Sequence, residues 1–201
     1  HSPLERGFDV DLPHWWGPGP KTSYLAPWGY ENPDFKEGEP GDHIEDRMAK
    51  EAVAWLKNRD DRKPFFMNYW QFSVHAPFGA KPELIDHYRK KLGDSVAGLS
   101  RPEVREKLLN PHEPGTGLPQ QSPTYAAMVH SLDDAVGSLL DALDAEGIAD
   151  DTVIVFYSDN GGNIHCGLEE VAASGAKYIT PITSNHPLRG GKGGIHEGGV
   201  R

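Results

Sequence analysis

Apolar residues recur at helical spacing in two stretches of this chain. Over about 43–58 and again over 125–143, an apolar side chain returns about every three or four residues, which is typical of the buried face of a helix. The longer stripe consists of Tyr125, Met128, Val129, Leu132, Val136, Leu139, Leu140 and Leu143. Gly147 follows it, at the kind of position where a glycine ends a helix. A further short helix is predicted over 81–92.

Two runs of β-branched and aromatic residues predict strands. One run extends from Phe65 to Ser73, directly after Pro64, and the other from Thr152 to Ser158. Helices and strands therefore alternate along the chain, and this order favours parallel strands covered by helices. The predicted fold class is α/β, with a mostly parallel sheet flanked by helices.

Two segments lack such a pattern. Residues 1–43 are rich in proline, glycine and aromatic residues, and we expect a loop region there. Residues 93–122 have weak periodicity and are predicted to form a surface excursion. A chain of 201 residues can form one domain. Because His1 is not an initiator methionine and Arg201 lies inside a motif, we expect 1–201 to be a single partial domain, internal to a longer protein.

Polar residues follow both predicted strands. Asp159-Asn160-Gly161-Gly162 comes directly after the second run, and His75 lies just past the first. Sites in open α/β sheets gather beyond the carboxyl ends of the strands. Carboxylate and amide oxygens suit Ca²⁺ or Mg²⁺, although the same residues also make a good turn without a ligand. Such an ion takes about six to eight oxygens, so further ligands must come from elsewhere.

A glycine-rich segment, 188–201, contains Lys192 between glycines. Glycines let the backbone approach an anion closely, and an ammonium group provides a point charge for it. A lysine in a flexible, solvated loop has the same local sequence. Taken with Asp159 and Asn160, the segment indicates a metal site beside an anion site.

These motifs resemble those of the sulfatases of the alkaline-phosphatase-like superfamily. Ser158–Gly161 resembles the family's S-D-N-G, and residues 188–201 resemble its L-R-G-G-K-G-x-x-x-E-G-G-x-R, in the family's order. The resemblance implies an alkaline phosphatase/sulfatase-like three-layer sandwich, incomplete here. It also implies that Asp159 and Asn160 bind Ca²⁺ ahead of Mg²⁺, and that Lys192 holds the sulfate.

The histidines and the cysteine differ in how well they fit this resemblance. Residues 72–78 look like the family's strand-end segment, whose histidine contacts the sulfate or protonates the leaving group. We therefore expect His75 to bind substrate and to act in catalysis, because histidine is the residue type best suited to proton transfer near neutral pH. A structural histidine is the alternative. His165 is a weak candidate for substrate contact, His196 is interpreted as a surface residue, and Cys166 as a bystander.

The resemblance implies a sulfuric ester hydrolase acting on a sulfated carbohydrate or another sulfate ester. Its formylglycine nucleophile derives from a cysteine in a C-x-[PA]-x-R motif, which this sequence lacks. We therefore expect the nucleophile to lie outside this chain and the chain alone to be inactive. One alternative is a phosphodiesterase or phosphonate hydrolase of the same superfamily, against which Asn160 argues. The other is a non-catalytic remnant that binds calcium and an anion.

Composition excludes several other classes. The net charge of −10 argues against a nucleic-acid partner. No apolar stretch approaches the roughly 20 residues of a membrane span, and a single cysteine allows no internal disulfide. The family resemblance implies a periplasmic, extracellular or lysosomal protein.

Overall fold

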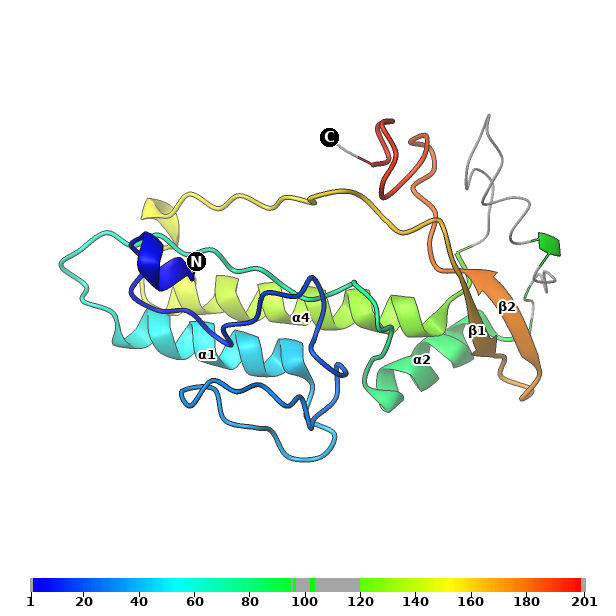
Figure 1. Cartoon of the computed structure of the whole chain (residues 1–201), viewed down its shortest axis with the longest axis horizontal. Coiled ribbons are helices and arrows are strands. Elements are labelled where there is room, and N and C mark those ends of the chain that lie inside the picture. The colour runs from blue at the N-terminus through cyan, green and yellow to red at the C-terminus, as the bar shows by residue number, and fades with distance from the viewer. Residues whose placement is uncertain (1, 95, 97–101, 104–119, 200–201) are drawn as a thin grey trace. The chain divides into compact units, whose positions relative to one another are not determined.

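The computed structural model describes residues 2–94, 96, 102–103 and 120–199. Its helices are α1 (Ile44–Asn58), α2 (Pro82–Leu92) and α4 (Pro123–Ala145), with 3-10 turns at Pro3–Arg6 and Ala149–Asp151. Its strands are β1 (Gly167–Val171) and β2 (Lys177–Pro181), as Figure 1 shows. The chain divides into two compact units. The first contains the residues up to Lys81 and Ala127–Val153, and the second contains Pro82–Ala126 and the residues from Ile154 onward.

The three predicted helices are confirmed. In the first unit, α1 and the C-terminal half of α4 share a core in which Leu56 packs with Ala142 and Leu143. Gly147 ends this region in the left-handed conformation (φ 67°), and its N–H donates to the carbonyl of Asp144 (3.0 Å). Leu139 and Leu143 of the longer apolar stripe therefore lie in or against this core, whereas Val129 and Leu140 of the same stripe are exposed.

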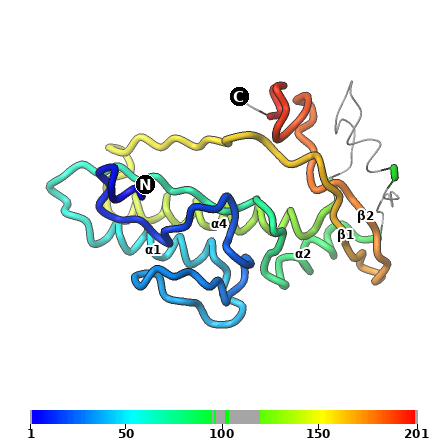
Figure 2. Tube along the Cα trace, viewed as in Figure 1, coloured from blue at the N-terminus to red at the C-terminus, as the bar shows by residue number. Residues whose placement is uncertain are grey.

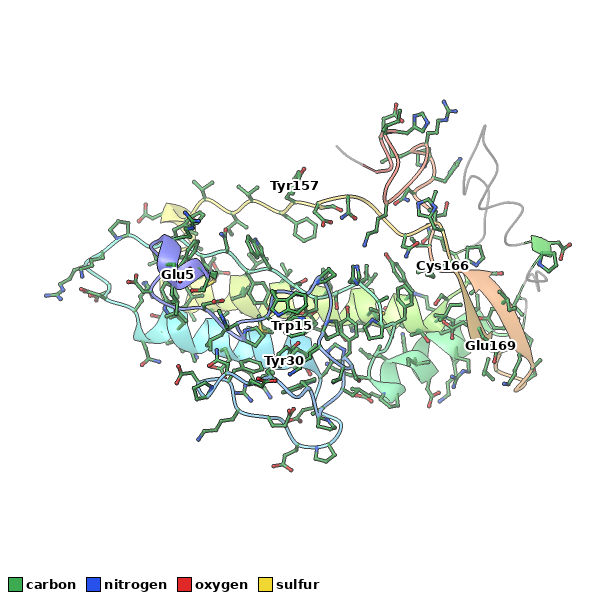
Figure 3. All side chains as sticks on the ribbon, in the orientation of Figure 1. Glu5, Trp15, Tyr30, Tyr157, Cys166 and Glu169 are labelled. Carbon is green, nitrogen blue, oxygen red and sulfur yellow. The ribbon has the colours of Figure 1, made fainter. Side chains whose placement is uncertain are left out.

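Aromatic rings pack the loop region of residues 2–43. Trp28 is completely buried, and its indole N–H donates to the carbonyl of Tyr24 (3.2 Å). Trp15 meets Tyr30 edge to face, with ring centroids 6.1 Å apart (Figure 3). The guanidinium of Arg47 lies 4.6 Å from the ring centroid of Phe35, which attaches the loop region to α1.

The strands predicted at 65–73 and 152–158 do not form, and this prediction was wrong for the described residues. A strand requires a hydrogen-bonded neighbour, and the only ladder among the described ranges joins β1 and β2. Residues 65–70 still alternate between half-buried and exposed positions, and Phe66 and Trp70 are the exposed aromatic ones. The second run is exposed from Val153 (91%) to Ser158, and only Thr152 is half-buried. The α/β class stands, whereas the parallel sheet stays a prediction. The excursion predicted at 93–122 lies mostly outside the described residues.

An antiparallel hairpin, which the sequence pattern did not predict, forms the sheet of the second unit. β1 and β2 lie side by side (Figure 2), and their register pairs Gly167 with Pro181 and Val171 with Lys177. From β1, the buried carboxylate of Glu170 accepts hydrogen bonds from the Ser122 hydroxyl (2.5 Å) and from the Thr124 N–H (3.1 Å). Glu170 thereby caps the start of α4 and fixes the hairpin to that end of the helix.

Candidate active site

The two sequence motifs pack directly on each other within the second unit. The backbone N–H of Lys192 donates to the carbonyl of Gly162 (2.9 Å). Gly161 is left-handed (φ 74°), and a Cβ there would collide with the carbonyl oxygen of Gly198. Because only glycine allows this approach, the two segments lie backbone to backbone.

A series of tight turns shapes the segment that carries Lys192. The N–H of Gly194 donates to the carbonyl of Gly191 (2.8 Å), and the N–H of Gly198 donates to that of Arg189 (2.8 Å). Gly193, next to the lysine, has a φ of 81°. The Lys192 side chain is half-buried. A lysine ammonium group provides a point charge that suits an anion.

Asp159 and Asn160 are held side by side. The amide Nδ2 of Asn160 donates to Oδ2 of Asp159 (2.7 Å), so this bond uses neither Oδ1 of Asp159 nor Oδ1 of Asn160. Both oxygens are hard donors, and this pair fits a Ca²⁺ ion in its chemistry. In the described part of the chain, no three His, Cys, Asp or Glu side chains come close enough to hold a metal together. The pair therefore accounts for only part of a coordination shell.

His165 belongs to the same group of loops. Its Nε2 lies within hydrogen-bonding distance of the carbonyl of Lys192, and its backbone N–H donates to Oδ1 of Asn163 (2.9 Å). If Nε2 carries the proton, Nδ1 is the acceptor of the neutral ring. Cys166 is exposed just before β1 (Figure 3), and we find no chemistry for it.

His75 lies in the first unit, at the end of the run 65–73. Its backbone N–H donates to the carbonyl of Phe72 (2.9 Å), and its Nδ1 lies 2.8 Å from the carbonyl of Ala76. A carbonyl oxygen only accepts, so this contact assigns the neutral-ring proton to Nδ1 and makes Nε2 the acceptor. The half-buried ring therefore has a defined tautomer, as a proton-transferring histidine requires.

Glu45 and Tyr24 hold the segment that ends in His75, and sequence reasoning missed both. Oε1 of the fully buried Glu45 accepts from the backbone N–H of Ser73 (2.7 Å). Burial raises the pKa of the Glu45 carboxyl. The Tyr24 hydroxyl contacts the carbonyls of Phe72 (2.7 Å) and His75 (2.8 Å). The only sequence signal was an acidic residue in the first turn of α1, which is also ordinary helix chemistry.

Asn185 is a third residue that sequence reasoning missed. Its side-chain amide accepts from the N–H of Gly162 (3.0 Å) and donates to the carbonyls of Gly162 (3.2 Å) and Gly190 (3.1 Å). It thus bonds to both motifs. Of the predicted site residues, the structure brings Lys192 and His165 together with the segment of Asp159 and Asn160, whereas His75 belongs to the other unit.

Comparison with known proteins identifies the family. The Sulfatase family profile matches residues 13–201, so the chain belongs to the sulfatase family. It is 32% identical over 179 residues to a sulfatase of Formosa agariphila, an alignment that covers 85% of this chain and 25% of that protein. It is 28% identical over 176 residues to mouse arylsulfatase J, covering 88% and 21%. It is 37% identical over 155 residues to mouse steryl-sulfatase, covering 77% and 18%.

The chain spans at most a quarter of the length of these three relatives. Among the residues that the structure describes, no helix is long and apolar enough to cross a membrane.

Proposed function

We propose that the complete gene product containing this chain hydrolyses sulfuric esters, either of a sulfated carbohydrate or of another alcohol. The observation that carries this proposal is the packing of the Lys192 loop on the segment Asp159–Gly162. This packing supports the proposal, because the segment that carries the cationic Lys192 lies against the segment that carries the oxygen ligands of Asp159 and Asn160. A sulfate ester requires both kinds of group, since negative charge develops on its oxygens as the ester bond breaks.

The proposed role of Lys192 is to bind the sulfate. Its ammonium group would neutralise a sulfate oxygen and stabilise the developing charge on the ester oxygen. The turns around it support this role, because they fix the backbone on both sides of the lysine. His165 would approach the same sulfate from the neighbouring turn.

Asp159 and Asn160 would hold a Ca²⁺ ion, ahead of Mg²⁺, through their Oδ1 atoms. When bound, this ion would supply positive charge to the sulfate and its nucleophile. The Asn160–Asp159 hydrogen bond supports the assignment, because it orients the two side chains relative to each other before an ion arrives.

The proposed role of His75 is to give a proton to the leaving alcohol. Its Nδ1 contact with Ala76 supports this role, since it leaves Nε2 to carry and release the proton. A formylglycine from outside this chain would supply the nucleophile. We further propose that residues 1–201 are part of one catalytic domain with the family's three-layer sandwich, and that the protein works in the periplasm, outside the cell or in a lysosome.

An assay on the complete gene product tests the proposal. Turnover of 4-nitrophenyl sulfate is compared with that of bis(4-nitrophenyl) phosphate, in the wild type and in Lys192→Ala. Lys177→Ala is the matched control, because Lys177 is an exposed lysine of the same unit whose Nζ contacts Glu169 (3.1 Å). We expect sulfate ester turnover, with kcat/KM lower by about 10²–10³ in Lys192→Ala only. A wild type that cleaves only the phosphodiester, or neither ester, refutes the proposal.

A further inference from the structure

The side-chain amide of Asn185 forms hydrogen bonds with two glycine-containing segments through all of its polar groups. Its Oδ1 accepts from Gly162, while Nδ2 donates to the carbonyls of Gly162 and Gly190. An asparagine amide offers one carbonyl oxygen and two N–H donors, so each group has a backbone partner. Gly162 lies two residues after Asn160, and Gly190 lies two residues before Lys192.

The glycines around this amide leave no room for a side chain. A Cβ at Gly162 would lie 2.9 Å from Oδ1 of Asn185 and 2.6 Å from Cγ2 of Thr183. A Cβ at Gly191 would lie 2.7 Å from Nδ2 of Asn185. These glycines therefore allow two backbone segments to pack closely around the Asn185 amide. This role is separate from any approach of the backbone to an anion.

The backbone of Asn185 is fixed as well. Its carbonyl accepts from the N–H of Leu188 (2.9 Å), which closes the turn leading into the Lys192 loop. The amide therefore projects from a turn of defined shape. Lys192 adds one more bond between the segments through its N–H to Gly162.

We infer that Asn185 is a positioning residue. It sets the position of Lys192 relative to Asp159 and Asn160 through a hydrogen-bonded cross-link between their two segments. This inference rests on the proposed function for its kinetic consequence, whereas the cross-link itself can be measured without turnover. The three hydrogen bonds of the Asn185 side chain all go to backbone groups, so it would act through Lys192 rather than on the substrate.

The kinetic test uses the complete gene product and 4-nitrophenyl sulfate. We expect Asn185→Ala to lower kcat/KM on the order of 100-fold, since a displacement of about 1 Å at a reacting group has that effect. Asn185→Asp keeps the size and the acceptor but replaces the donor with an oxygen facing two carbonyls, so we expect a similar loss. Asn58→Ala is the control, because Asn58 is an exposed asparagine whose Nδ2 donates to a backbone carbonyl, that of Ala54 (2.7 Å). We expect it to match the wild type.

A double-mutant cycle separates positioning from general damage. If Asn185 acts through Lys192, adding Asn185→Ala to Lys192→Ala changes kcat/KM by less than about threefold. A full, multiplicative loss in the double variant overturns the inference, as does an Asn185→Ala variant that matches Asn58→Ala. An Asn185→Asp variant with wild-type activity would overturn the part assigned to the Nδ2 donors.

Amide hydrogen exchange at Lys192 tests the cross-link in the same protein without substrate. We expect exchange faster on the order of tenfold in Asn185→Ala and unchanged in Asn58→Ala. Unchanged exchange in Asn185→Ala overturns the inference. If the wild type hydrolyses no sulfate ester while the exchange result holds, the proposed function fails and the cross-link stands.

Discussion

Replacing Gly191 with alanine tests how tightly the two motifs are packed. The added Cβ would lie 2.6 Å from the carbonyl oxygen of Gly162, 2.7 Å from Nδ2 of Asn185 and 2.9 Å from Cγ1 of Ile164. None of these atoms can move away at low cost. The first is backbone, the second is held by two carbonyls, and the third belongs to a side chain that is only 1% exposed.

The expected loss has two parts. Overfilling a close-packed site costs about 1–3 kcal/mol. Separating the segments also weakens the two hydrogen bonds to the Gly162 carbonyl, from the Lys192 N–H and from Asn185, each worth about 1 kcal/mol. Because the segments can relax by giving up either the contacts or the bonds, the two parts overlap. We expect a loss of about 3 kcal/mol in the free energy of local opening.

Hydrogen exchange followed by mass spectrometry measures this free energy on peptides covering 159–166 and 188–199. A loss of about 3 kcal/mol corresponds to exchange roughly 100-fold faster. Gly137→Ala is the control, because a Cβ at this position of α4 would meet nothing within 4 Å. Alanine there should stabilise the helix by about 1 kcal/mol. Exchange in Gly191→Ala within threefold of the wild type would refute the packing argument.

Three further variants test separate parts of the site. Asp159→Ala should abolish binding of Ca²⁺ to the complete protein, measured by calorimetry after removal of the ion with a chelator; unchanged metal content would exclude Asp159 as a ligand. His75→Ala should slow aryl sulfates with poor leaving groups most, and an equal loss for all leaving groups would argue against proton donation. Because burial raises the pKa of Glu45 above its ordinary 4.5, the folded chain keeps this proton to higher pH than the unfolded one, and stability falls as pH rises through that window. Glu45→Gln should remove this fall from urea unfolding measured between pH 4 and 8, and an identical pH dependence in both proteins would contradict the assignment.

The helices were predictable because their signal is local. The apolar positions of 43–58 and 125–143 repeat with the helical period, and the bounds of α1 and α4 lie within two residues of the prediction at each end. The composition of the two predicted strands is equally typical of strands. A strand also needs a neighbouring strand to bond with, and composition does not show which segment that would be. Both runs leave large apolar residues exposed, such as Phe66 and Val153, and neither run forms a ladder with another strand among the described residues.

The hairpin was missed for the opposite reason. β1 reads Gly-Leu-Glu-Glu-Val, and two adjacent glutamates disfavour a strand. Glu169 is tolerated because Lys177 lies diagonally across the hairpin from it, with Nζ 3.1 Å from Oε1. Glu170 is tolerated because Ser122 and Thr124, at the start of α4, satisfy its buried carboxylate. The partners of Glu170 lie 46 and 48 residues before it in the chain, so no window of sequence around β1 contains them. Lys177 follows Glu169 by only eight residues, but composition does not reveal the hairpin register that brings the two side chains together.

The candidate site divides along the same line. Lys192, Asp159 and Asn160 could be proposed from the sequence as site residues, because chemistry restricts which residue types suit an anion or a hard cation. Asn185 could not, because an asparagine in a Ser-Asn-His-Pro stretch has the composition of an ordinary turn. Yet consecutive glycines carry backbone N–H and C=O groups with no side chain to cover them, and each buried group needs a partner. A side-chain amide can donate to such groups and accept from them at once, and Asn185 does so between the two glycine segments with its three hydrogen bonds.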